Sequence, residues 1–346
     1  MLKVYTLEKH EEWDKIVKSF KQHDVYYLSG YTKAFYLHGD GEPLLFYYED
    51  QNIKAINVVM KRDISKDSHF ANKIEPNKYY DFTTPYGYGG WLIEGEGSLD
   101  NLLNEYKAWC KDNSIISEVI RFHPVLANQE RVRDVYDIMD LGNTISIDLT
   151  NEEDIWNNFS CKNRNVIRKA IKNNVTISKG LNEELIDAFI NVYNQTMNRD
   201  NADNYYYFKK EFYDSIQNDL KDNAEVYYAE YDNKIIAASI ILKENERLSY
   251  HLSGSLREYG SLAATNLLLY EVAKWGAQNG YKSFHLGGGV GSKEDNLYSF
   301  KKAFYKGEGY QYSIGRMIFN NELYEKLVEL RNGEELRQNF FPLYRA

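Results

Sequence analysis

A glycine cluster followed by a lysine is the stretch of this sequence that most directly suggests chemistry. Residues 284–304 read FHLGGGVGSKEDNLYSFKKAF, which predicts a strand, a glycine-rich turn and a helix. A Walker-type phosphate loop requires Gly-Lys-Ser/Thr, but Ser292 separates Gly291 from Lys293 here. The dinucleotide-binding pattern also fails at Ser292, and two acidic residues before the helix would repel an anion. The cluster is therefore not expected to bind nucleotide phosphates.

Two roles for the glycine cluster stay open. Because glycine lacks Cβ, Gly287, Gly288 and Gly289 would let a substrate approach the backbone amides closely. The cluster could equally be a simple turn between a strand and a helix. In either case Asp295 is expected to cap the helix, and Gly307 to end it.

The helix after the cluster carries a candidate catalytic lysine. Leu297, Phe300 and Phe304 have the spacing of a buried helical stripe, and Lys301 lies beside it. A positive charge next to a reacting carbonyl could stabilise the oxyanion of a tetrahedral acyl-transfer intermediate. A solvated surface lysine is the alternative.

A second basic feature is a stripe on one helix face. Arg164, Arg168 and Lys172 are spaced at i, i+4 and i+8, so they share that face. They could contact the diphosphate of a nucleotide-linked acceptor or the phosphates of a tRNA. A solvated helix face is the alternative.

Aromatic and polar residues offer further candidates. The turn-rich motif TPYGYGG contains Tyr86 and Tyr88, which could line an acceptor groove with Asp81 and Lys33, or could belong to a packing loop. Tyr250 and the neighbouring histidine could orient an attacking amine.

That histidine, His251, could also be a satisfied core residue. No Ser-His-Asp set, zinc-ligand spacing or pair of carboxylates is evident. Direct transfer to a neutral amine is therefore favoured over a covalent enzyme intermediate.

Length and composition limit the class of protein. A chain of 346 residues, 43% hydrophobic and 27% charged, predicts a globular protein of about two domains. The net charge of −9 argues against a DNA-binding protein or an anionic-membrane footprint. The N-terminal stretch has no apolar signal region, no run is long enough to span a membrane, and the two cysteines have no metal spacing. These features predict a cytoplasmic protein without a metal site or integral membrane association.

An internal repeat predicts the architecture. DQNIKAINVVMK at 50–61 matches DNKIIAASIILK at 232–243, and LLNEYKAWCKDN at 102–113 matches LLYEVAKWGAQN at 268–279. Each copy indicates an antiparallel hairpin followed by a strand, a helix and another strand. The prediction is a tandem α/β protein with mixed sheets and helices on both faces, divided into domains 1–150 and 151–346.

This order of elements, with the motifs YYDFTTPYGYGGW, RNVIRKAIKN and YHLSGSLREYG, resembles the FemABX-like transferases of compact FemX type. The resemblance implies two tandem GNAT-like (acyl-CoA N-acyltransferase) domains. The N-terminal domain would serve the acceptor side, and the C-terminal domain the donor and catalytic side. The resemblance further implies transfer of an acyl or aminoacyl group to a primary amine of a peptidoglycan or surface-polysaccharide precursor.

The donor implied by the resemblance is either acyl-CoA or aminoacyl-tRNA, with no permanently bound cofactor. The acceptor would be a nucleotide-linked or lipid-linked sugar or peptide precursor. GNAT enzymes that bind CoA carry Arg/Gln-x-x-Gly-x-Gly/Ala before a helix. In REYGSL, Arg257 and Gly260 fit this pattern, whereas Leu262 departs from it. The departure weakens the case for CoA and leaves a non-catalytic binding module as the alternative function.

The resemblance also assigns roles, with the family's Phe-Lys pair corresponding to Phe300-Lys301 and its acceptor segment loosely to the region of Arg199 and Tyr207. The expected catalytic residues are Lys301, Phe300, Tyr250 and His251; the donor-binding residues are Arg257, Gly260, Gly287, Gly288 and Gly289; and the acceptor-binding residues are Lys33, Asp81, Tyr86, Tyr88, Arg164, Arg168, Arg199 and Tyr207.

Overall fold

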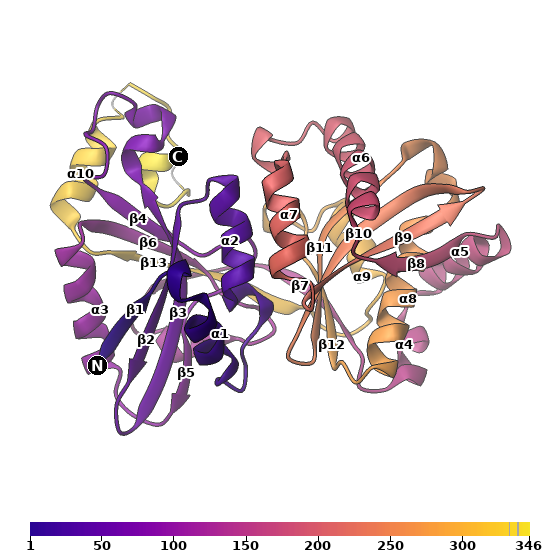
Figure 1. Cartoon of the computed structure of the whole chain (residues 1–346), viewed down its shortest axis with the longest axis horizontal. Helices are drawn as coiled ribbons and strands as arrows, with labels where there is room; N and C mark the ends of the chain where they lie inside the picture. The colour runs from indigo at the N-terminus through magenta and orange to yellow at the C-terminus, as the bar shows by residue number, and fades with distance from the viewer. Residues whose placement is uncertain (332, 338) are drawn as a thin grey trace. The chain divides into compact units, whose positions relative to one another are not determined.

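The chain forms two compact units in a computed structural model (Figure 1). The structure describes residues 1–331, 333–337 and 339–346. Unit 1 contains Met1–Leu141 and Tyr312–Ala346, and unit 2 contains Gly142–Gln311. Each unit has a mixed sheet with helices, as the repeat predicted. No helix in the described part of the chain is long and apolar enough to cross a membrane.

The sheet of unit 1 has the strand order β1-β2-β3-β4-β6-β13, and β5 pairs with β3. Its strands are β1 (Leu2–Tyr5), β2 (Glu42–Glu49), β3 (Ile53–Asp63), β4 (Tyr80–Thr83), β5 (Leu92–Gly95), β6 (Ile115–Arg121) and β13 (Tyr310–Ile318), and its helices are α1 (His10–Lys18), α2 (Ser29–His38), α3 (Asp100–Asp112) and α10 (Asn321–Glu329). Leu102, Tyr106 and Cys110 of α3 are spaced at helical intervals and are buried against aromatic side chains of the sheet.

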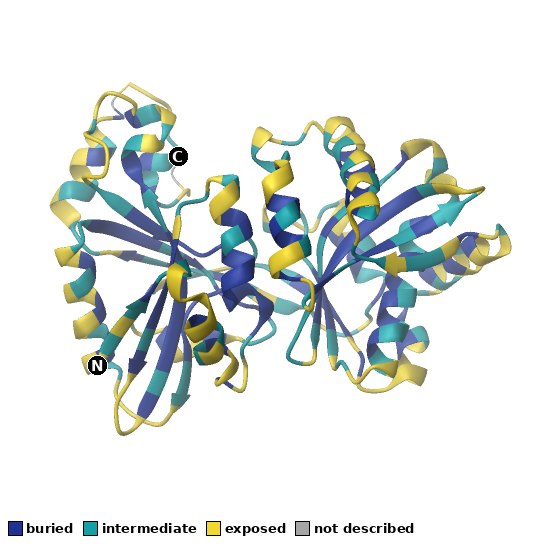
Figure 2. Ribbon diagram, in the orientation of Figure 1, coloured by how far each residue is buried: buried dark blue, intermediate teal, exposed yellow. Residues whose placement is uncertain are grey.

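The sheet of unit 2 has the corresponding order β8-β9-β10-β11-β12-β7. Its strands are β7 (Asp137–Asp148), β8 (Thr176–Gly180), β9 (Ala224–Tyr231), β10 (Lys234–Glu244), β11 (Arg247–Ser255) and β12 (Ser283–Gly287), and its helices are α4 (Glu152–Asn158), α5 (Cys161–Lys172), α6 (Glu183–Arg199), α7 (Lys210–Asp219), α8 (Ala264–Gln278) and α9 (Asn296–Lys302). The core forms where α8 packs on the sheet, and α4 and α5 pack against α8. Figure 2 shows much of the central strand β10 as buried and the outer faces of the helices as exposed.

The two predicted repeats occupy equivalent places in the two units. The hairpins are β2–β3 and β9–β10, and the repeated helices are α3 and α8, which lead into β6 and β12. In each unit the strand after the hairpin runs parallel to the strand after the helix, as β4 with β6 and β11 with β12. The mixed α/β architecture therefore follows the sequence prediction.

The last strand of each sheet comes from the part of the chain that the sequence assigned to the other copy. Residues 145–148 of β7 pair antiparallel with β12, and residues 314–318 of β13 pair antiparallel with β6. Each exchanged strand satisfies the backbone hydrogen bonds along an otherwise open strand edge. The compact units consequently differ from the predicted boundary at residue 150, and 312–346 lies in unit 1 rather than with the second domain.

Buried polar contacts hold the C-terminal segment in unit 1. The Arg331 guanidinium donates to the carbonyls of Tyr344 and Ala346 at 2.7 and 2.8 Å. The Arg345 guanidinium binds the carboxylates of Asp81 and Asp67 at 2.6 and 2.9 Å. These long-range contacts explain why the segment belongs to unit 1.

Candidate active site

The candidate catalytic residues of unit 2 lie around the carboxyl ends of β11 and β12. These strands pair in parallel over Arg247–Ser249 and Ser283–His285, near their starts. The residues that follow, on β11 and after β12, include most of those predicted to bind the donor or to catalyse transfer. In mixed α/β sheets, the carboxyl ends of neighbouring parallel strands are the usual place for a ligand site.

A β-bulge re-aims His251 on β11. Ile240 pairs with Leu252 and Ile241 pairs with Tyr250, so His251 is the extra residue between them. Such bulges commonly redirect a side chain next to an active site. Burial lowers the pKa of His251 to about 3 and raises the pKa of Tyr250. With so low a pKa, the His251 imidazole is neutral at pH 7 and is a weak base. It is therefore better suited to orient an acceptor amine than to remove a proton from that amine.

Lys301 is buried on α9. Only 8% of this residue is exposed, and its Nζ donates to the Gly288 carbonyl at 2.7 Å. Burial lowers the Lys301 pKa to about 8, although the charge of Asp295 acts in the opposite direction. The alternative of a solvated surface lysine is therefore excluded. Its ammonium lies directly beside the glycine turn.

The helix that carries Lys301 differs from the prediction in two details. Asp295 caps it as expected, with Oδ1 accepting from the Tyr298 amide at 2.8 Å. However, the helix ends at Lys302, so the prediction that Gly307 ends it is wrong. Leu297 is 39% exposed, and Tyr298 is buried in its place. The buried face of this short helix therefore consists of Tyr298 and Lys301, which are three residues apart and lie on the same side.

The glycine turn is shaped by internal packing. The Asp295 Oδ2 accepts from the Val290 amide at 3.0 Å, so a carboxylate binds amides that a phosphate loop would offer to its ligand. Gly287 has a left-handed φ of +79°, and a Cβ on Gly289 would lie 2.0 Å from the Lys293 carbonyl oxygen. The role of a simple turn accounts for these glycines. In addition, the turn places the Gly288 carbonyl that orients Lys301.

The REYGSL segment adopts a different conformation from an amide-presenting phosphate loop. Residues Arg257–Leu262 form a 3-10 helix, in which the amide of Tyr259 donates to the Leu256 carbonyl. The Ala263 amide likewise donates to the Gly260 carbonyl, which leaves both amides engaged within the turn. Arg257 and Gly260 are exposed at its surface.

Three arginines predicted to bind the acceptor make contacts within unit 2. The Arg164 Nη1 donates to the Phe159 carbonyl at 2.6 Å, just beyond α4, and the Arg168 guanidinium stacks over the Trp156 ring at 5.1 Å. The Arg199 Nη1 donates to the Ser255 carbonyl at 2.9 Å. The predicted basic stripe is therefore partly used to hold neighbouring elements together.

Tyr207 lies near Arg199 in this unit. Its hydroxyl donates to the Asn198 Oδ1 at 2.8 Å, so it is tied to the end of α6. This contact places the segment predicted to bind the acceptor beside the end of β11, to which Arg199 is bound.

Asp81 takes part in a buried ion-pair network of unit 1. Its carboxylate accepts from the Arg62 Nε at 2.8 Å, from the Arg345 Nε at 2.6 Å and from the Tyr344 hydroxyl at 3.0 Å. Because Asp81 is completely buried, it has no exposed face with which to line an acceptor groove as predicted. Burial raises the pKa of Asp81, but the charges and hydrogen bonds of Arg62 and Arg345 together outweigh this effect, so the pKa lies below its ordinary value.

The tyrosines of TPYGYGG belong to an aromatic cluster of unit 1. The Tyr86 ring stacks on Phe35 with a centroid distance of 5.5 Å, and the Tyr31 hydroxyl donates to the Tyr86 carbonyl at 2.5 Å. The Tyr88 ring lies edge-on to Tyr312 at 5.7 Å. Tyr86 and Tyr88 are half-buried, as is the predicted acceptor-binding Lys33 on α2.

Two residues at the end of β6 were not predicted as site residues from the sequence, in which SEVIRFH indicated only a strand. Arg121 donates to the Thr84 carbonyl at 2.6 Å, and His123 lies with its Nε2 3.5 Å from the Asp24 carboxylate. The available signal was the presence of a cation and an imidazole among the last residues of that predicted strand.

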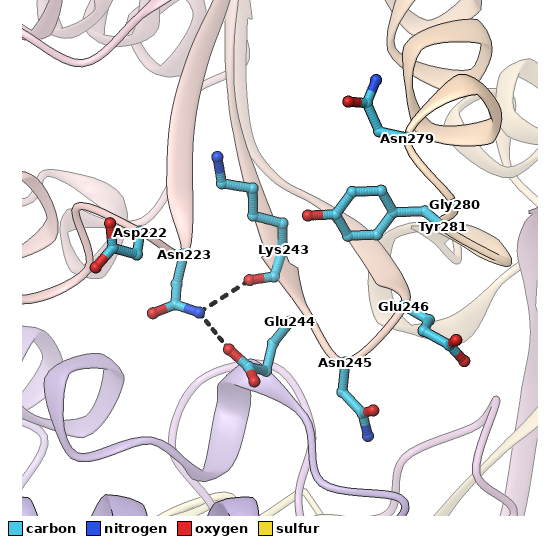
Figure 3. Close-up of a pocket in the computed structure, with 9 residues that line it drawn as sticks. All are labelled: Asp222, Asn223, Lys243, Glu244, Asn245, Glu246, Asn279, Gly280 and Tyr281. Atoms are coloured by element: carbon cyan, nitrogen blue, oxygen red, sulfur yellow. Dashed lines mark hydrogen bonds between the residues drawn. The ribbon is translucent and has the colours of Figure 1, made fainter.

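A separate pocket of about 250 Å³ lies at the β10–β11 turn of unit 2 (Figure 3). The Asn223 amide donates to the Lys243 carbonyl and to the Glu244 carboxylate, as the dashed lines show. Lys243 pairs with Glu225 at 3.3 Å. None of the predicted catalytic or binding residues lines this pocket. Across the described ranges, no cluster of three or more His, Cys, Asp or Glu side chains could hold a metal ion.

Comparisons with known proteins agree with this architecture. Residues 162–302 match the family described as Acetyltransferase (GNAT) domain. A solved structure of FemX has a TM-score of 0.69 and 14% identity, with 94% of this chain and 99% of that chain covered. The structure of L-PGS from Bacillus licheniformis has a TM-score of 0.55 and 15% identity, covering 94% and 95% of the two chains. The predicted tandem GNAT-like fold and the resemblance to FemABX-like transferases are confirmed.

A curated relative carries a printed activity. The chain is 23% identical over 175 residues to the UDP-N-acetylmuramoylpentapeptide-lysine N(6)-alanyltransferase of Weissella viridescens. The match covers 49% of this chain and 51% of the relative, so the chain spans about half the length of the curated protein it matches.

Proposed function

We propose that this protein transfers an aminoacyl group to a primary amine of a nucleotide-linked peptidoglycan precursor. The observation that carries the proposal is Lys301, a buried lysine bound to the carbonyl of a glycine turn within the unit that matches a GNAT domain. The relative from Weissella viridescens supports the acceptor class, because its printed name specifies alanyl transfer to a lysine of UDP-N-acetylmuramoylpentapeptide.

In this reaction the neutral acceptor amine attacks the carbonyl carbon of an aminoacyl ester. A C–N bond forms, the ester C–O bond breaks, and the proton of the amine leaves with the departing hydroxyl group. The Lys301 ammonium stabilises the negative charge that develops on the carbonyl oxygen. Because burial excludes water around Lys301, that interaction is stronger than it would be at the surface. His251, neutral at pH 7, orients the amine.

The proposed donor is an aminoacyl-tRNA rather than acyl-CoA. The REYGSL segment supports this choice, because its 3-10 conformation engages amides that a CoA-binding loop would direct at a pyrophosphate. Acceptance of acetyl-CoA as donor would instead assign the chain to the acetyltransferases.

The test combines the purified protein with UDP-N-acetylmuramoyl-pentapeptide and either alanyl-tRNA or acetyl-CoA, and identifies the product by mass spectrometry. Alanylated peptide is expected only with alanyl-tRNA. Lys301→Met should lower kcat about 100- to 1,000-fold, as the loss of an oxyanion-stabilising group does. Lys302→Met is the matched control, because the neighbouring lysine of α9 also donates to a backbone carbonyl, that of Gly307.

Two results would contradict the proposal. Full activity of Lys301→Met would remove the catalytic assignment of this residue. Saturable acceptor binding without product from either donor would favour a binding module that has kept the fold and lost transfer activity.

A further inference from the structure

Arg121 of unit 1 occupies a position at which the fold can recognise a ligand. It is the last residue of β6, and the TPYGYGG loop directly follows β4, the parallel neighbour of that strand (Figure 1). Both features therefore lie at the carboxyl ends of a parallel pair, where ligands of mixed α/β sheets usually bind.

Backbone groups of that loop hold Arg121 without neutralising its charge. Its Nη2 donates to the carbonyls of Thr84 and Pro85 at 2.6 and 3.2 Å, and the Gly89 amide donates to the Arg121 carbonyl at 2.8 Å. Its Nε is buried and has no hydrogen-bond partner in the described part of the chain. Most of the donor capacity of this half-buried guanidinium is therefore not used by the loop.

Other enclosed arginines of unit 1 have carboxylate partners. Arg62 pairs with Asp81 at 2.8 Å, Arg345 pairs with the same carboxylate at 2.6 Å, and Arg331 pairs with Glu334 at 2.8 Å. Within the described residues, Arg121 has no carboxylate within 4.0 Å of its guanidinium nitrogens. A charge withdrawn from water without a counter-ion costs free energy. Binding of an anionic ligand next to Arg121 would therefore supply the missing counter-ion and reduce this cost.

Two tyrosines complete the surroundings of Arg121. Tyr88 and Tyr312 are half-buried, and their rings meet edge-on at 5.7 Å. Tyr88 directly precedes Gly89, whose amide donates to the Arg121 carbonyl. Burial raises the pKa of both phenols, and the Arg121 charge partly opposes this rise. With these pKa values raised, both hydroxyls keep their protons at pH 7.

We propose that Arg121, together with Tyr88 and Tyr312, forms a subsite that recognises an oxyanion of the acceptor, either a carboxylate of its peptide or a phosphoryl group of its nucleotide. The planar fork of an arginine matches the acceptor oxygens of both groups. This assignment rests on the proposed function for its ligand, and it adds the group by which the acceptor is recognised.

The first experiment measures acceptor binding by isothermal titration calorimetry. Arg121→Met should raise the Kd for UDP-N-acetylmuramoyl-pentapeptide about 10- to 100-fold, whereas Arg121→Lys should lose less. Arg133→Met is the matched control, since Arg133 is an exposed arginine of the same unit already paired with Glu130 at 2.8 Å. Higher salt should weaken binding by the wild type more than binding by Arg121→Met.

Two ligand fragments distinguish the sources of the oxyanion. UDP-N-acetylglucosamine carries the diphosphate and no carboxylate, and the free pentapeptide carries carboxylates and no phosphate. A weakening by Arg121→Met that is confined to the pentapeptide identifies a carboxylate, and one confined to the nucleotide sugar identifies a phosphoryl group.

The second experiment does not depend on the proposed function. The Arg121 Nε–H signal, assigned by its loss in Arg121→Lys, is followed by NMR during titration with inorganic phosphate and with glutarate. A saturable shift with either anion supports the subsite even if the protein fails to bind the muramyl peptide. No shift with either anion would overturn it. An unchanged Kd for the muramyl peptide in Arg121→Met would overturn it too, while leaving the proposed function intact.

Discussion

The two units share a strand order but use the polar groups after their parallel strand pairs differently. In unit 1, the segment after β6 carries Asn128, whose amide donates to the carbonyls of Gly89 and Trp91 and whose Oδ1 accepts from the His123 amide. In unit 2, the segment after β12 carries Lys301, for which the described residues supply one hydrogen-bond acceptor, the Gly288 carbonyl. One polar side chain closes a loop, whereas the other retains a charge that can act on a substrate.

Buried carboxylates extend this difference. Asp81 of unit 1 has two arginine partners, and Glu118 accepts hydrogen bonds from Tyr106, Tyr136 and Asn57 at 2.8 to 3.0 Å. These groups are bound on several sides by the protein itself. Two units with the same strand order can thus differ in how they use buried polar groups, which in unit 1 are bound by the protein and in unit 2 include the lysine of the proposed transfer reaction. Arg121 is the exception in unit 1 and is therefore informative.

The largest expected effect on stability concerns the ion pairs that hold the C-terminal segment. Arg345→Met leaves Asp81 with one cation and Asp67 without that partner, so the free energy of unfolding should fall by about 3–5 kcal/mol. Chemical denaturation measures the change. Arg133→Met, which breaks an exposed pair, should leave the denaturation midpoint unchanged. Equal midpoints for all three proteins would show that the buried charges of unit 1 do not stabilise it.

The next effect is a pH dependence of stability caused by Glu118. Burial raises its pKa to about 7, whereas the ordinary value is 4.5. The folded state therefore binds more protons than the unfolded state between these pH values, and stability falls as pH rises from about 4.5 through 7. The total fall should be about 3 kcal/mol.

Glu118→Gln isolates this contribution, because glutamine stays neutral at every pH and retains an oxygen acceptor. The difference in unfolding free energy between the two proteins should shift in favour of the variant as pH rises from 4.5 to 7, and it should level off above pH 7. A difference that does not change between pH 4.5 and 8 would contradict the assignment.

The smallest expected effect is on the pH dependence of catalysis. The Lys301 pKa of about 8 means that its ammonium loses its proton above that pH, whereas an arginine keeps its charge. The ratio of wild-type kcat to Lys301→Arg kcat should therefore fall about tenfold between pH 7 and 9. Deprotonation of the acceptor amine affects both proteins equally and cancels in the ratio. A ratio that rises with pH would indicate that neutral Lys301 acts as a base.

Much of the local structure could be predicted because it depends on neighbouring residues. The spacing of apolar residues located the helices α3 and α8, and β-branched runs around polar turns located the hairpins. The cap at Asp295 followed from the hydrogen bond that an aspartate makes to a nearby amide. The predicted buried face of α9 was wrong at Leu297, which is exposed. Burial in a short helix depends on which of its faces packs against the rest of the unit, and local spacing does not determine this.

The candidate site was predicted in part. The sequence singled out Lys301 by its position after the glycines and by the family resemblance, and the structure buries it beside their turn. Asp81 was assigned to an acceptor groove, but in the structure it is bound by Arg345. The sequence could not indicate this pairing, because the two residues are 264 positions apart and no local pattern connects them. Arg121 was missed because its significance lies in the absence of a carboxylate partner among the described residues, which only packing reveals.

The tandem design, the two hairpins, the repeated helices and the residue types available for transfer all follow from the sequence alone. They depend on backbone preferences and hydrophobic periodicity within short windows. Tertiary packing, in contrast, decides that β7 pairs with β12 and β13 pairs with β6, in sheets other than those expected. It also decides that Asp81 is bound by arginine within unit 1, whereas Lys301 donates to one backbone carbonyl. The two groups of properties differ because strand-edge pairing and the pairing of buried charges depend on which distant segments meet, whereas a helix or a hairpin depends on residues near in the chain.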